Sequence, residues 1–283
     1  MSTEAVAAPR AREIHGPSAY GGGWRRFVHL TWLIALTDYR LTYFGSALGY
    51  LWSLMRPLLL FGVLYVVFSE FLRFGEDVPH YPDVLLMNIV LFTFFSEATG
   101  NAVRSVVNRE SLVRKMHFPR MVIPLSSVVT SMLNLAANLV AVFVFILIDG
   151  VEPRASWLLL PVLLIPLVLF TAGVSMILSS LYVSYRDVQP IWAVFTQLLF
   201  YGTPILYVID VIPGKFQELL MANPLAAMLE QARKWLIDPS APAFTEAIGG
   251  FPLWIIPVAI VVVVCAFGLW LFNHEAPKIA ERL

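Results

Sequence analysis

The residues that could do chemistry in this 283-residue chain are few and scattered. The one Gly-Lys pair, Gly214-Lys215, lacks the upstream glycine and the following Ser or Thr of a phosphate-binding P-loop. The histidines form no ligand pair at helical spacing, and carboxylates do not cluster on the expected cytoplasmic face as a metal-dependent transferase would need. We therefore expect no catalytic residue, cofactor site or metal site in this chain.

The strongest charge pattern is a basic segment over residues 104–120, which lies between two long apolar stretches. It holds one acid, Glu110, and the cations Arg104, Arg109, Arg114, Lys115 and Arg120. Bases beside membrane-length segments resist translocation, so the positive-inside rule places this segment in the cytoplasm. Its helical periodicity is poor. We interpret it as a span that ends near Asn108, then a short helix over about 109–117 that Pro119 stops.

Glu97 stands out as an ionisable residue inside an apolar stretch. A carboxylate in lipid is costly, which indicates a role in a transport pathway. The polar residues around it, Ser96, Thr99, Gly100 and Asn101, favour the alternative of a contact within the helix bundle.

Aromatic residues gather in two other apolar stretches: Tyr50, Trp52, Phe61, Tyr65 and Phe68 in one, and Trp192, Phe195, Phe200 and Tyr201 in the other. Ring faces offer contact to sugar C–H groups without strong hydrogen bonds, which suits a moving polymer. Helix packing or contact with lipid is the alternative interpretation.

The composition that surrounds these residues is that of an integral membrane protein. Hydrophobic residues make up 59% of the chain and charged residues 13%, and the mean hydropathy is +0.76. Ordinary soluble domains carry about a quarter charged residues. The single cysteine, Cys265, lies in an apolar stretch, so the sequence predicts a buried thiol and no disulfide.

The N-terminal part of the chain is polar and then amphipathic. Residues 1–23 are rich in Ala, Gly, Pro and charge, which predicts a disordered cytoplasmic tail. Over 24–44, a helical wheel gathers Arg25, Arg26, His29 and Arg40 on one side, opposite Trp24, Phe27, Val28, Ala35 and Tyr39. Such a helix lies among lipid headgroups at the membrane surface. A plain positive anchor for the first span is the alternative.

Six apolar stretches are long enough to cross about 30 Å of hydrocarbon as helices. They cover about 50–72, 84–103, 121–148, 157–185, 190–209 and 251–273. The fold class is therefore all-α, with six transmembrane helices. Residues 274–283 form a charged tail, and both termini lie in the cytoplasm because most Lys and Arg residues fall on that side.

The longest outer segment, residues 210–250, contains two short helices within 213–237. Asn223-Pro224 is an N-cap followed by proline at the first helical position. One apolar face then repeats at helical spacing: Leu225, Met228, Leu229, Ala232, Trp235 and Leu236. Glu230, Gln231, Arg233 and Lys234 lie opposite. These helices are too short to span, so we expect an interfacial or re-entrant pair.

Five strings, in order along residues 25–273, resemble one family. They are DYRLTYFGSALGYLWSLMRP at 38–57, KMHFPR at 115–120 with PLS at 124–126, YRDV at 185–188, PILY at 204–207 and NPL at 223–225. The sequence resembles the ABC-2 type permeases that export lipid-linked polysaccharides, such as O-antigen, teichoic acid, capsule and galactan exporters. Each string alone is weak, but their order and spacing are specific.

The resemblance implies a single permease domain over 24–273 and a functional homodimer in the bacterial inner membrane. It also implies two separate ATP-binding cassette subunits, which would hold ATP and Mg. The substrate would be a polyprenyl-pyrophosphate-linked polysaccharide that moves outward from the cytoplasm. Membrane lipid is the remaining partner, and no nucleic acid is expected.

The resemblance also suggests roles for particular residues. The coupling helix that contacts the ATPase would fall on Arg109, Glu110, Leu112, Arg114, Lys115, His117 and Phe118. Arg56 would meet the pyrophosphate, since a guanidinium matches phosphate oxygens, although snorkelling to headgroups is as reasonable. The substrate path would include Tyr50, Trp52, Phe61, Tyr65, Glu97, Trp192, Phe195 and Tyr201. The outer gate would include Asn223, Pro224, Met228 and Trp235.

Three alternatives stay open at this point. An ABC-2 exporter of a drug or small lipid would share the fold, but those exporters usually lack the aromatic first span and the amphipathic leading helix. A membrane enzyme acting on polyprenyl phosphates would need clustered acids or histidines near one membrane face. A proton-driven carrier would show several paired charges at the membrane midplane, and Glu97 alone supports it weakly.

Overall fold

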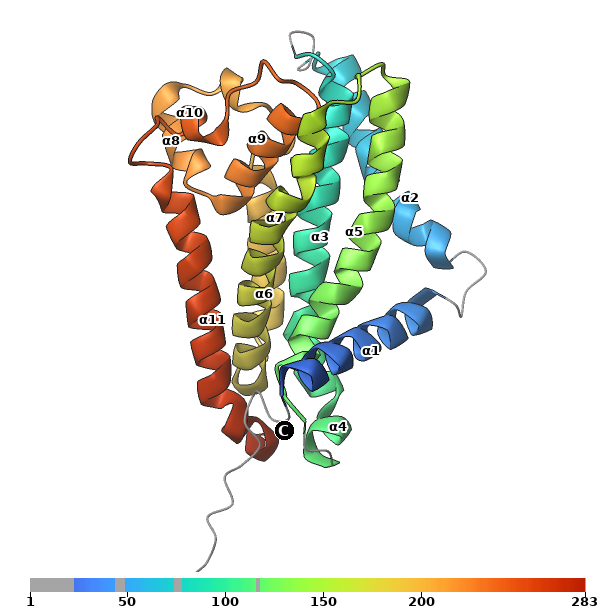
Figure 1. The fold of residues 1–283 in the computed structure, drawn as a ribbon, viewed down its shortest axis with the longest axis vertical. Helices are drawn as coiled ribbons and strands as arrows, with labels where there is room; N and C mark the ends of the chain where they lie inside the picture. Colours follow the sequence, from blue (N-terminus) through green and yellow to red (C-terminus); the bar gives the residue numbers. More distant parts are fainter. Residues whose placement is uncertain (1–22, 44–48, 74–77, 116–117, 283) are drawn as a thin grey trace, which may run out of the picture.

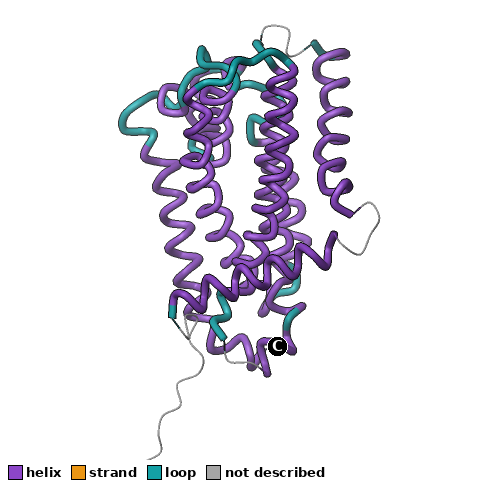
Figure 2. Tube along the Cα trace, turned by 45° about the vertical axis from the view of Figure 1, so that its right-hand side comes forward, coloured by secondary structure: helices purple, strands orange, loops and turns teal. Residues whose placement is uncertain are grey.

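The structure, a computed structural model, describes residues 23–43, 49–73, 78–115 and 118–282, and these ranges contain helices and no strand (Figures 1 and 2). The helices are α1 (Trp24–Tyr43), α2 (Gly49–Tyr65), α3 (Tyr81–Asn108), α4 (Glu110–Lys115), α5 (Val122–Ile148), α6 (Leu160–Ser184), α7 (Val188–Gly202), α8 (Gly214–Met221), α9 (Pro224–Leu236), α10 (Phe244–Ala247) and α11 (Ile255–Arg282). Shorter helical turns cover Val66–Phe71, Ala155–Leu159 and Ile209–Val211.

Among the residues that the structure describes, five helical segments are long and apolar enough to cross a membrane: Leu51–Phe71, Tyr81–Asn108, Val122–Ile148, Ala155–Ser184 and Ile255–Pro277. The sequence also predicts a span over 190–209. In the structure its helix, α7, has 15 residues and ends at Gly202. Thr203 is extended, as expected for a residue before proline, and Pro204 has no amide hydrogen to continue the helix.

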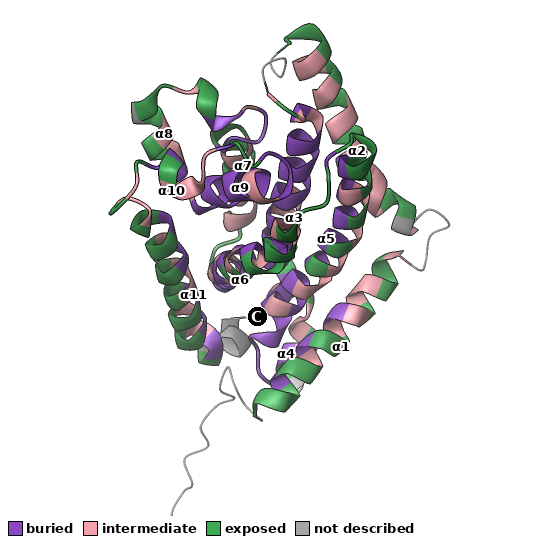
Figure 3. Ribbon diagram, turned by 45° about the horizontal axis from the view of Figure 1, so that its top comes forward, coloured by how far each residue is buried: buried purple, intermediate pink, exposed green. Residues whose placement is uncertain are grey.

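Helix α3 lies in the middle of the bundle and is buried on nearly all sides (Figures 1 and 3). It packs against α5, α6, α7 and α2. Helices α6 and α11 approach each other closely at two glycines. A Cβ added at Gly268 would lie 2.5 Å from the Gly173 carbonyl oxygen, so this crossing requires glycine.

The outer helices of the bundle expose apolar faces. Helix α2 stands at the edge of the bundle, and most of its surface is open (Figure 3). Large apolar residues such as Val140, Leu158 and Ile165 are exposed on α5 and on the segment that leads into and includes α6. In water these faces would be unfavourable, whereas hydrocarbon solvates them, so they are the expected lipid-facing surfaces.

Helix α1 crosses the end of the bundle where α4 and the end of α11 also lie (Figure 1). It packs against α5 through Phe27, Thr31 and Ala35, which are buried. The predicted apolar face grouped Trp24 and Val28 with Phe27. In the structure Trp24 and Val28 are exposed, because the contact with α5 follows a narrower stripe at every fourth residue.

The opposite end of the bundle carries a cap made of α8, α9 and α10 (Figures 1 and 3). Helix α9 lies against α3, α6 and α11, and nearly all of its residues are buried. A separate small core joins α8, α9 and α10 through Ile209, Met221, Ala226, Ala247 and Ile248. The cap is therefore a packed part of the fold.

Candidate functional site

An open cavity of about 680 Å³ lies between α2, α3 and α7. Apolar and polar side chains share its wall: Arg56, Leu60, Phe92, Ser96, Gly100, Val103, Gln189, Trp192, Ala193, Thr196, Gln197 and Phe200. Helix α2 supplies the only charged residue of this lining. We call this cavity the Arg56 groove.

Glu97 of α3 does not line the groove, but its carboxylate faces Arg56; the sequence singles out both residues. Arg56 Nη1 lies 3.9 Å from Glu97 Oε1, which is beyond hydrogen-bond distance. The Arg56 side chain is 75% exposed and that of Glu97 29% exposed. The pair is therefore loose, and the guanidinium remains accessible from the groove.

Trp192 is held in the groove wall by α3. Its indole Nε1 donates a hydrogen bond to Thr99 Oγ1 at 3.1 Å, and its ring meets Phe95 edge-on with centroids 6.1 Å apart. Phe200 meets Phe92 in the same edge-on manner, at 5.4 Å. These contacts fix the rings, so the groove presents oriented aromatic surface beside a cation.

The other predicted path residues lie elsewhere. Phe61 and Tyr65 stack with each other, and Phe61 also contacts Phe145 of α5, away from the groove. Trp52, Phe195 and Tyr201 are exposed on the outer surface. The side chain of Tyr50 lies outside the described residues. The structure therefore does not join all the predicted aromatics into one path within a single chain.

The predicted coupling segment begins where α3 ends at Asn108, and α4 covers Glu110–Lys115. Arg114 Nε and Glu110 Oε1 form an ion pair at 2.9 Å, one helical turn apart, and Arg114 is exposed while Glu110 is half-buried. Leu112 is half-buried. Phe118 is only 7% exposed because it packs into the bundle beside Phe27, so it anchors the segment in place of facing outward.

Two charged contacts tie the coupling segment to neighbouring helices. The Arg109 guanidinium pairs with the Asp38 carboxylate of α1, beside a polar cavity of about 560 Å³. The Arg120 guanidinium donates to the Ala276 carbonyl of α11, and burial lowers the pKa of Arg120 below its usual value. The side chain of Lys115 and all of His117 lie outside the described residues.

At the other end of the molecule, Asn223 caps α9 and connects it to α7. Its Oδ1 accepts a hydrogen bond from the Leu225 amide at 3.0 Å. Its Nδ2 donates to Thr203 Oγ1, also at 3.0 Å. Pro224 follows at the first helical position, where a missing amide hydrogen costs nothing.

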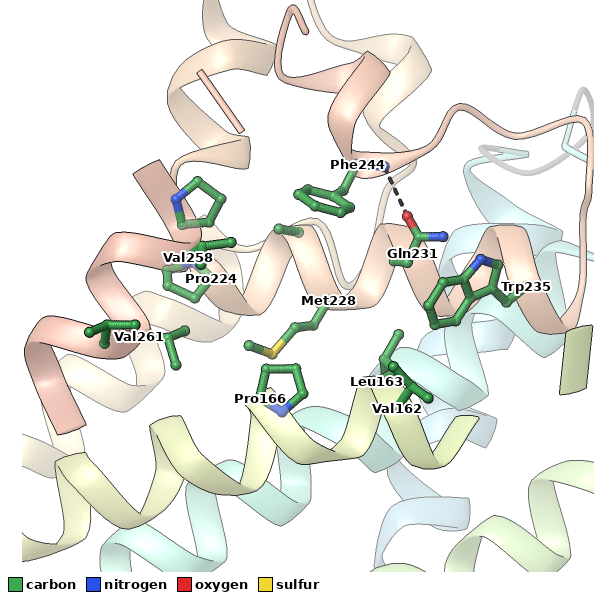
Figure 4. A pocket seen from close by; sticks show the side chains of 13 residues that line it. Val162, Leu163, Pro166, Pro224, Met228, Gln231, Trp235, Phe244, Val258 and Val261 are labelled. Atoms are coloured by element: carbon green, nitrogen blue, oxygen red, sulfur yellow. Dashed lines mark hydrogen bonds between the residues drawn. The ribbon is translucent and has the colours of Figure 1, made fainter. Parts of the chain in front are cut away.

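The remaining predicted gate residues line an apolar pocket of about 250 Å³ (Figure 4). In Figure 4, Met228 points from α9 toward Pro166 of α6, and Trp235 lies near Leu163. The Phe244 amide donates to Gln231 Oε1 at 3.3 Å and closes one side. Pro224 also contributes to the wall.

Helix α9 also contributes Glu230 and Arg233 to an ion cluster that corrects the sequence interpretation. The sequence predicts Glu230, Gln231 and Arg233 on the polar side of α9, opposite its apolar face, and in the structure this side is buried too. Arg233 is 4% exposed, and its guanidinium contacts Asp210 at 3.0 Å, Glu230 at 3.1 Å and Asp238 at 3.2 Å. We call these four residues the Arg233 cluster.

Burial and charge shift the pKa values of Glu230 and Asp238 in opposite directions. Burial raises the pKa of Glu230 to about 7, and the nearby Arg233 opposes the rise without cancelling it. For Asp238 burial also acts upward, but hydrogen bonds from Ser240 and Arg233 outweigh it and hold the pKa of Asp238 below its usual value.

Comparison with known proteins places these features in a family. The family described as ABC-2 type transporter matches residues 29–237, from α1 to the end of α9. The chain belongs to the ABC-2 type transporter family. This ABC-2 chain is 36% identical over 200 residues to the O-antigen export system permease protein RfbA of Klebsiella pneumoniae, covering 70% of this chain and 76% of the relative.

Two further relatives agree with this assignment. The O-antigen export system permease protein RfbA of Myxococcus xanthus is 30% identical over 189 residues, which cover 66% of this ABC-2 chain and 72% of the relative. The polysialic acid transport protein KpsM of Escherichia coli is 23% identical over 210 residues, which cover 68% of this ABC-2 chain and 76% of the relative.

Several residues at these sites of the ABC-2 chain escaped the sequence reasoning. Thr99 was noted only as a neighbour of Glu97, although its spacing from Phe95 and Phe92 places all three on one helix face. Gln189 lines the Arg56 groove and accepts a hydrogen bond from Arg104. Asp210 and Asp238 complete the Arg233 cluster from outside α9, so no local pattern could reveal them.

Proposed function

We propose that this ABC-2 chain is the permease subunit of an ATP-driven exporter for a polyprenyl-pyrophosphate-linked polysaccharide, acting in the bacterial inner membrane. The named relatives export O-antigen or transport polysialic acid, which supports a polysaccharide as the transported molecule. The observation that carries the proposal is the Arg56 groove, where an accessible guanidinium stands beside oriented aromatic rings.

The chemistry of the groove suits the two ends of such a substrate. A guanidinium binds two phosphate oxygens at once, and a pyrophosphate can displace a carboxylate that is only loosely paired at 3.9 Å. Trp192 and Phe200 border the same groove and offer flat apolar faces to sugar C–H groups. Polar side chains such as Gln189 and Gln197 supply hydrogen bonds to hydroxyl groups.

The full transport unit in this proposal is a homodimer of six-span subunits. Helix α7 is the sixth crossing. Its 15 residues cover about 22 Å, and residues 203–208 continue toward the cap. The exposed apolar faces of α2 and α7 are the surfaces that a second copy would cover. The end that carries α1, α4 and the C-terminus faces the cytoplasm, because the basic segment lies there (Figure 1).

Energy would come from two ATP-binding cassette subunits that hold ATP and Mg. Helix α4 would seat in the ATPase through its exposed face, which carries Arg114 and Glu110. The Asp38–Arg109 ion pair would pass movement of α4 to α1, and the continuation of the chain into α3 would pass it to the groove. The basic segment thus links ATP hydrolysis to the helices that border the substrate.

The deciding experiment reconstitutes the chain with its ATPase in vesicles that contain lipid-linked glycan, and measures ATP-dependent movement of glycan across the membrane. We expect Arg56→Ala to reduce transport roughly tenfold to a hundredfold, because a charge-assisted hydrogen bond contributes about 1.5–3 kcal/mol. Arg56→Lys should retain part of the activity, since it keeps the charge without the planar fork. Arg154→Ala, at an exposed outer arginine, is the matched control.

Three results would overturn the proposal. Glycan movement by the permease in the absence of any ATPase would remove ATP as the driving force. Full transport by Arg56→Ala would remove the groove as the binding site. ATP-dependent efflux of small apolar compounds with no movement of glycan would favour the drug or lipid exporter.

A second experiment tests the coupling helix. We expect Arg114→Glu to abolish co-purification with the ATPase or to uncouple ATP hydrolysis from transport, because it reverses the charge of the exposed face of α4. Arg154→Glu makes the same change on the outer loop, where a cytoplasmic subunit cannot reach it. Equal behaviour of the two variants would exclude α4 as the coupling element.

A further inference from the structure

Three potential metal ligands meet at the outer end of the bundle. His80 precedes α3, Asp83 lies in the first turn of α3, and Asp149 directly follows α5. Their ligand atoms all lie within 4.8 Å of one another, and His80 Nδ1 contacts Asp149 Oδ2. His80 and Asp149 are 69 residues apart in the sequence, so the fold brings them together.

Asp83 is the member of this group that needs a partner. It is only 3% exposed, and its Oδ2 has no hydrogen-bond partner among the described residues. A buried carboxylate without a partner is costly, and a second carboxylate nearby increases the cost through like-charge repulsion. The N-terminus of α3 offsets part of this charge, but a helix dipole acts over the first turn without supplying a bond to Oδ2.

The pairing of His80 does not remove the problem. Its Nδ1 is directed to Asp149, and no hydrogen bond joins His80 to the Asp83 carboxylate within the described ranges. A cation placed between the three side chains would contact Nδ1 and both carboxylates together. It would also relieve the repulsion between the two carboxyl groups that the fold brings side by side.

We propose that His80, Asp83 and Asp149 bind a divalent transition-metal cation. One imidazole and two carboxylates are ligands that Zn²⁺ and Mn²⁺ accept, and three protein ligands leave a position for water. The site shares no residue with the Arg56 groove, so it does not depend on the proposed function. The bound ion would join the turn before α3 to the turn after α5 and would fix the outer ends of both helices.

The test measures Zn²⁺ binding to the full chain, purified in detergent and stripped with a chelator. Calorimetric titration should show one Zn²⁺ per chain, and Zn²⁺ should raise the Tm. His80→Ala and Asp149→Asn should lose both the binding and the rise. His29→Ala, which removes an exposed histidine on α1 at the opposite end, is the matched control and should keep both.

Asp83→Asn separates metal binding from folding. The amide removes a buried charge, so this variant should be at least as stable as the wild type without metal and should lose the Zn²⁺-dependent rise in Tm. Mn²⁺ should compete with Zn²⁺ at the same site. The proposal is overturned if the wild type shows no saturable binding, if His80→Ala binds as the wild type does, or if Ca²⁺ binds equally well with and without His80.

Discussion

The Arg56 groove and the Arg233 cluster use the same chemical groups in opposite surroundings. Arg233 is 4% exposed and contacts three carboxylates within 3.2 Å. Arg56 is 75% exposed and faces one carboxylate at 3.9 Å. Arg233 is buried and has three carboxylate partners, so we expect it to stabilise the fold, whereas the donors of Arg56 are exposed and accessible to another molecule. Burial and the number of partners, rather than residue type, separate the two roles.

The energetic reason lies in desolvation. Burying a charge costs several kcal/mol, so a guanidinium is buried only where attraction and hydrogen bonds to its partners offset that cost. An exposed ion pair loses little solvation, and it typically contributes only about 0–1 kcal/mol to stability. Removing a residue from the first kind of site should therefore damage stability, and removing one from the second kind should damage binding alone.

The largest effect expected from this comparison is that of Arg233→Ala. Removal of the guanidinium leaves Glu230 and Asp238 buried beside each other without a cation. Loss of one partner from a buried ion pair typically costs about 3–5 kcal/mol. We expect a large fall in Tm in detergent and a loss of folded protein in the membrane fraction. Arg154→Ala, on the exposed loop that follows α5, should leave the Tm unchanged.

A Tm for Arg233→Ala close to that of the wild type would break the comparison. It would mean that the buried acids take up protons and that the cluster contributes little net stability. Arg233→Met separates loss of packing from loss of charge, because methionine fills much of the volume of the arginine side chain but carries no charge. If Arg233→Met is as unstable as Arg233→Ala, the cost comes from the unpaired acids.

Much of the fold can be predicted from local patterns in the sequence. The apolar lengths predict the long helices, and the end of α3 at Asn108 coincides with the loss of helical periodicity. Asn223-Pro224 predicts the start of α9, since both residues act within one turn of the helix. These features depend on neighbours in the sequence.

The features that the sequence did not reveal depend on residues far apart along the chain. The polar side of α9 is buried because Asp210 and Asp238, outside the helix, pair with Arg233. The group of His80, Asp83 and Asp149 combines two separate turns, which a search for histidines at helical spacing does not detect. Helix α7 ends early at Gly202, although the apolar pattern continues beyond it.

The second prediction concerns the pH dependence of the Arg233 cluster. The pKa of Glu230 rises from 4.5 to about 7 on folding because the side chain is buried. Between these values the folded state holds a proton that the unfolded state has lost, so this residue makes stability fall as pH rises. This loss of stability is absent below pH 4.5 and complete above pH 7. Between these values the free energy of unfolding falls by up to about 1.4 kcal/mol per pH unit.

Thermal unfolding at several pH values between 5 and 8 measures this slope, because this pH range includes the Glu230 pKa of about 7. Glu230→Gln carries no titratable group, so the difference between its Tm and that of the wild type isolates the residue. The Tm of Glu230→Gln, relative to that of the wild type, should increase as the pH rises. A difference that is flat with pH would show that Glu230 stays charged beside Arg233 throughout.

A smaller effect is expected at the N-cap of α9. Asn223→Ala removes the hydrogen bond to the Leu225 amide and the one to Thr203. Loss of an N-cap typically costs about 1 kcal/mol. Asn223→Asp keeps the cap and loses the donation to Thr203, so the Tm values of the two variants separate the two bonds. If Asn223→Asp is as stable as the wild type, the cap alone stabilises this end of α9.

The smallest effect on stability is expected where the effect on transport should be large. Arg56→Ala removes an exposed side chain whose ion pair with Glu97 is long, so the free energy of unfolding should change by less than about 0.5 kcal/mol. The Tm of this variant, measured on the same preparation as the transport assay, should match that of the wild type. A fall in Tm as large as that of Arg233→Ala would mean that Arg56 holds the helices together, and its loss of transport could no longer be assigned to substrate binding.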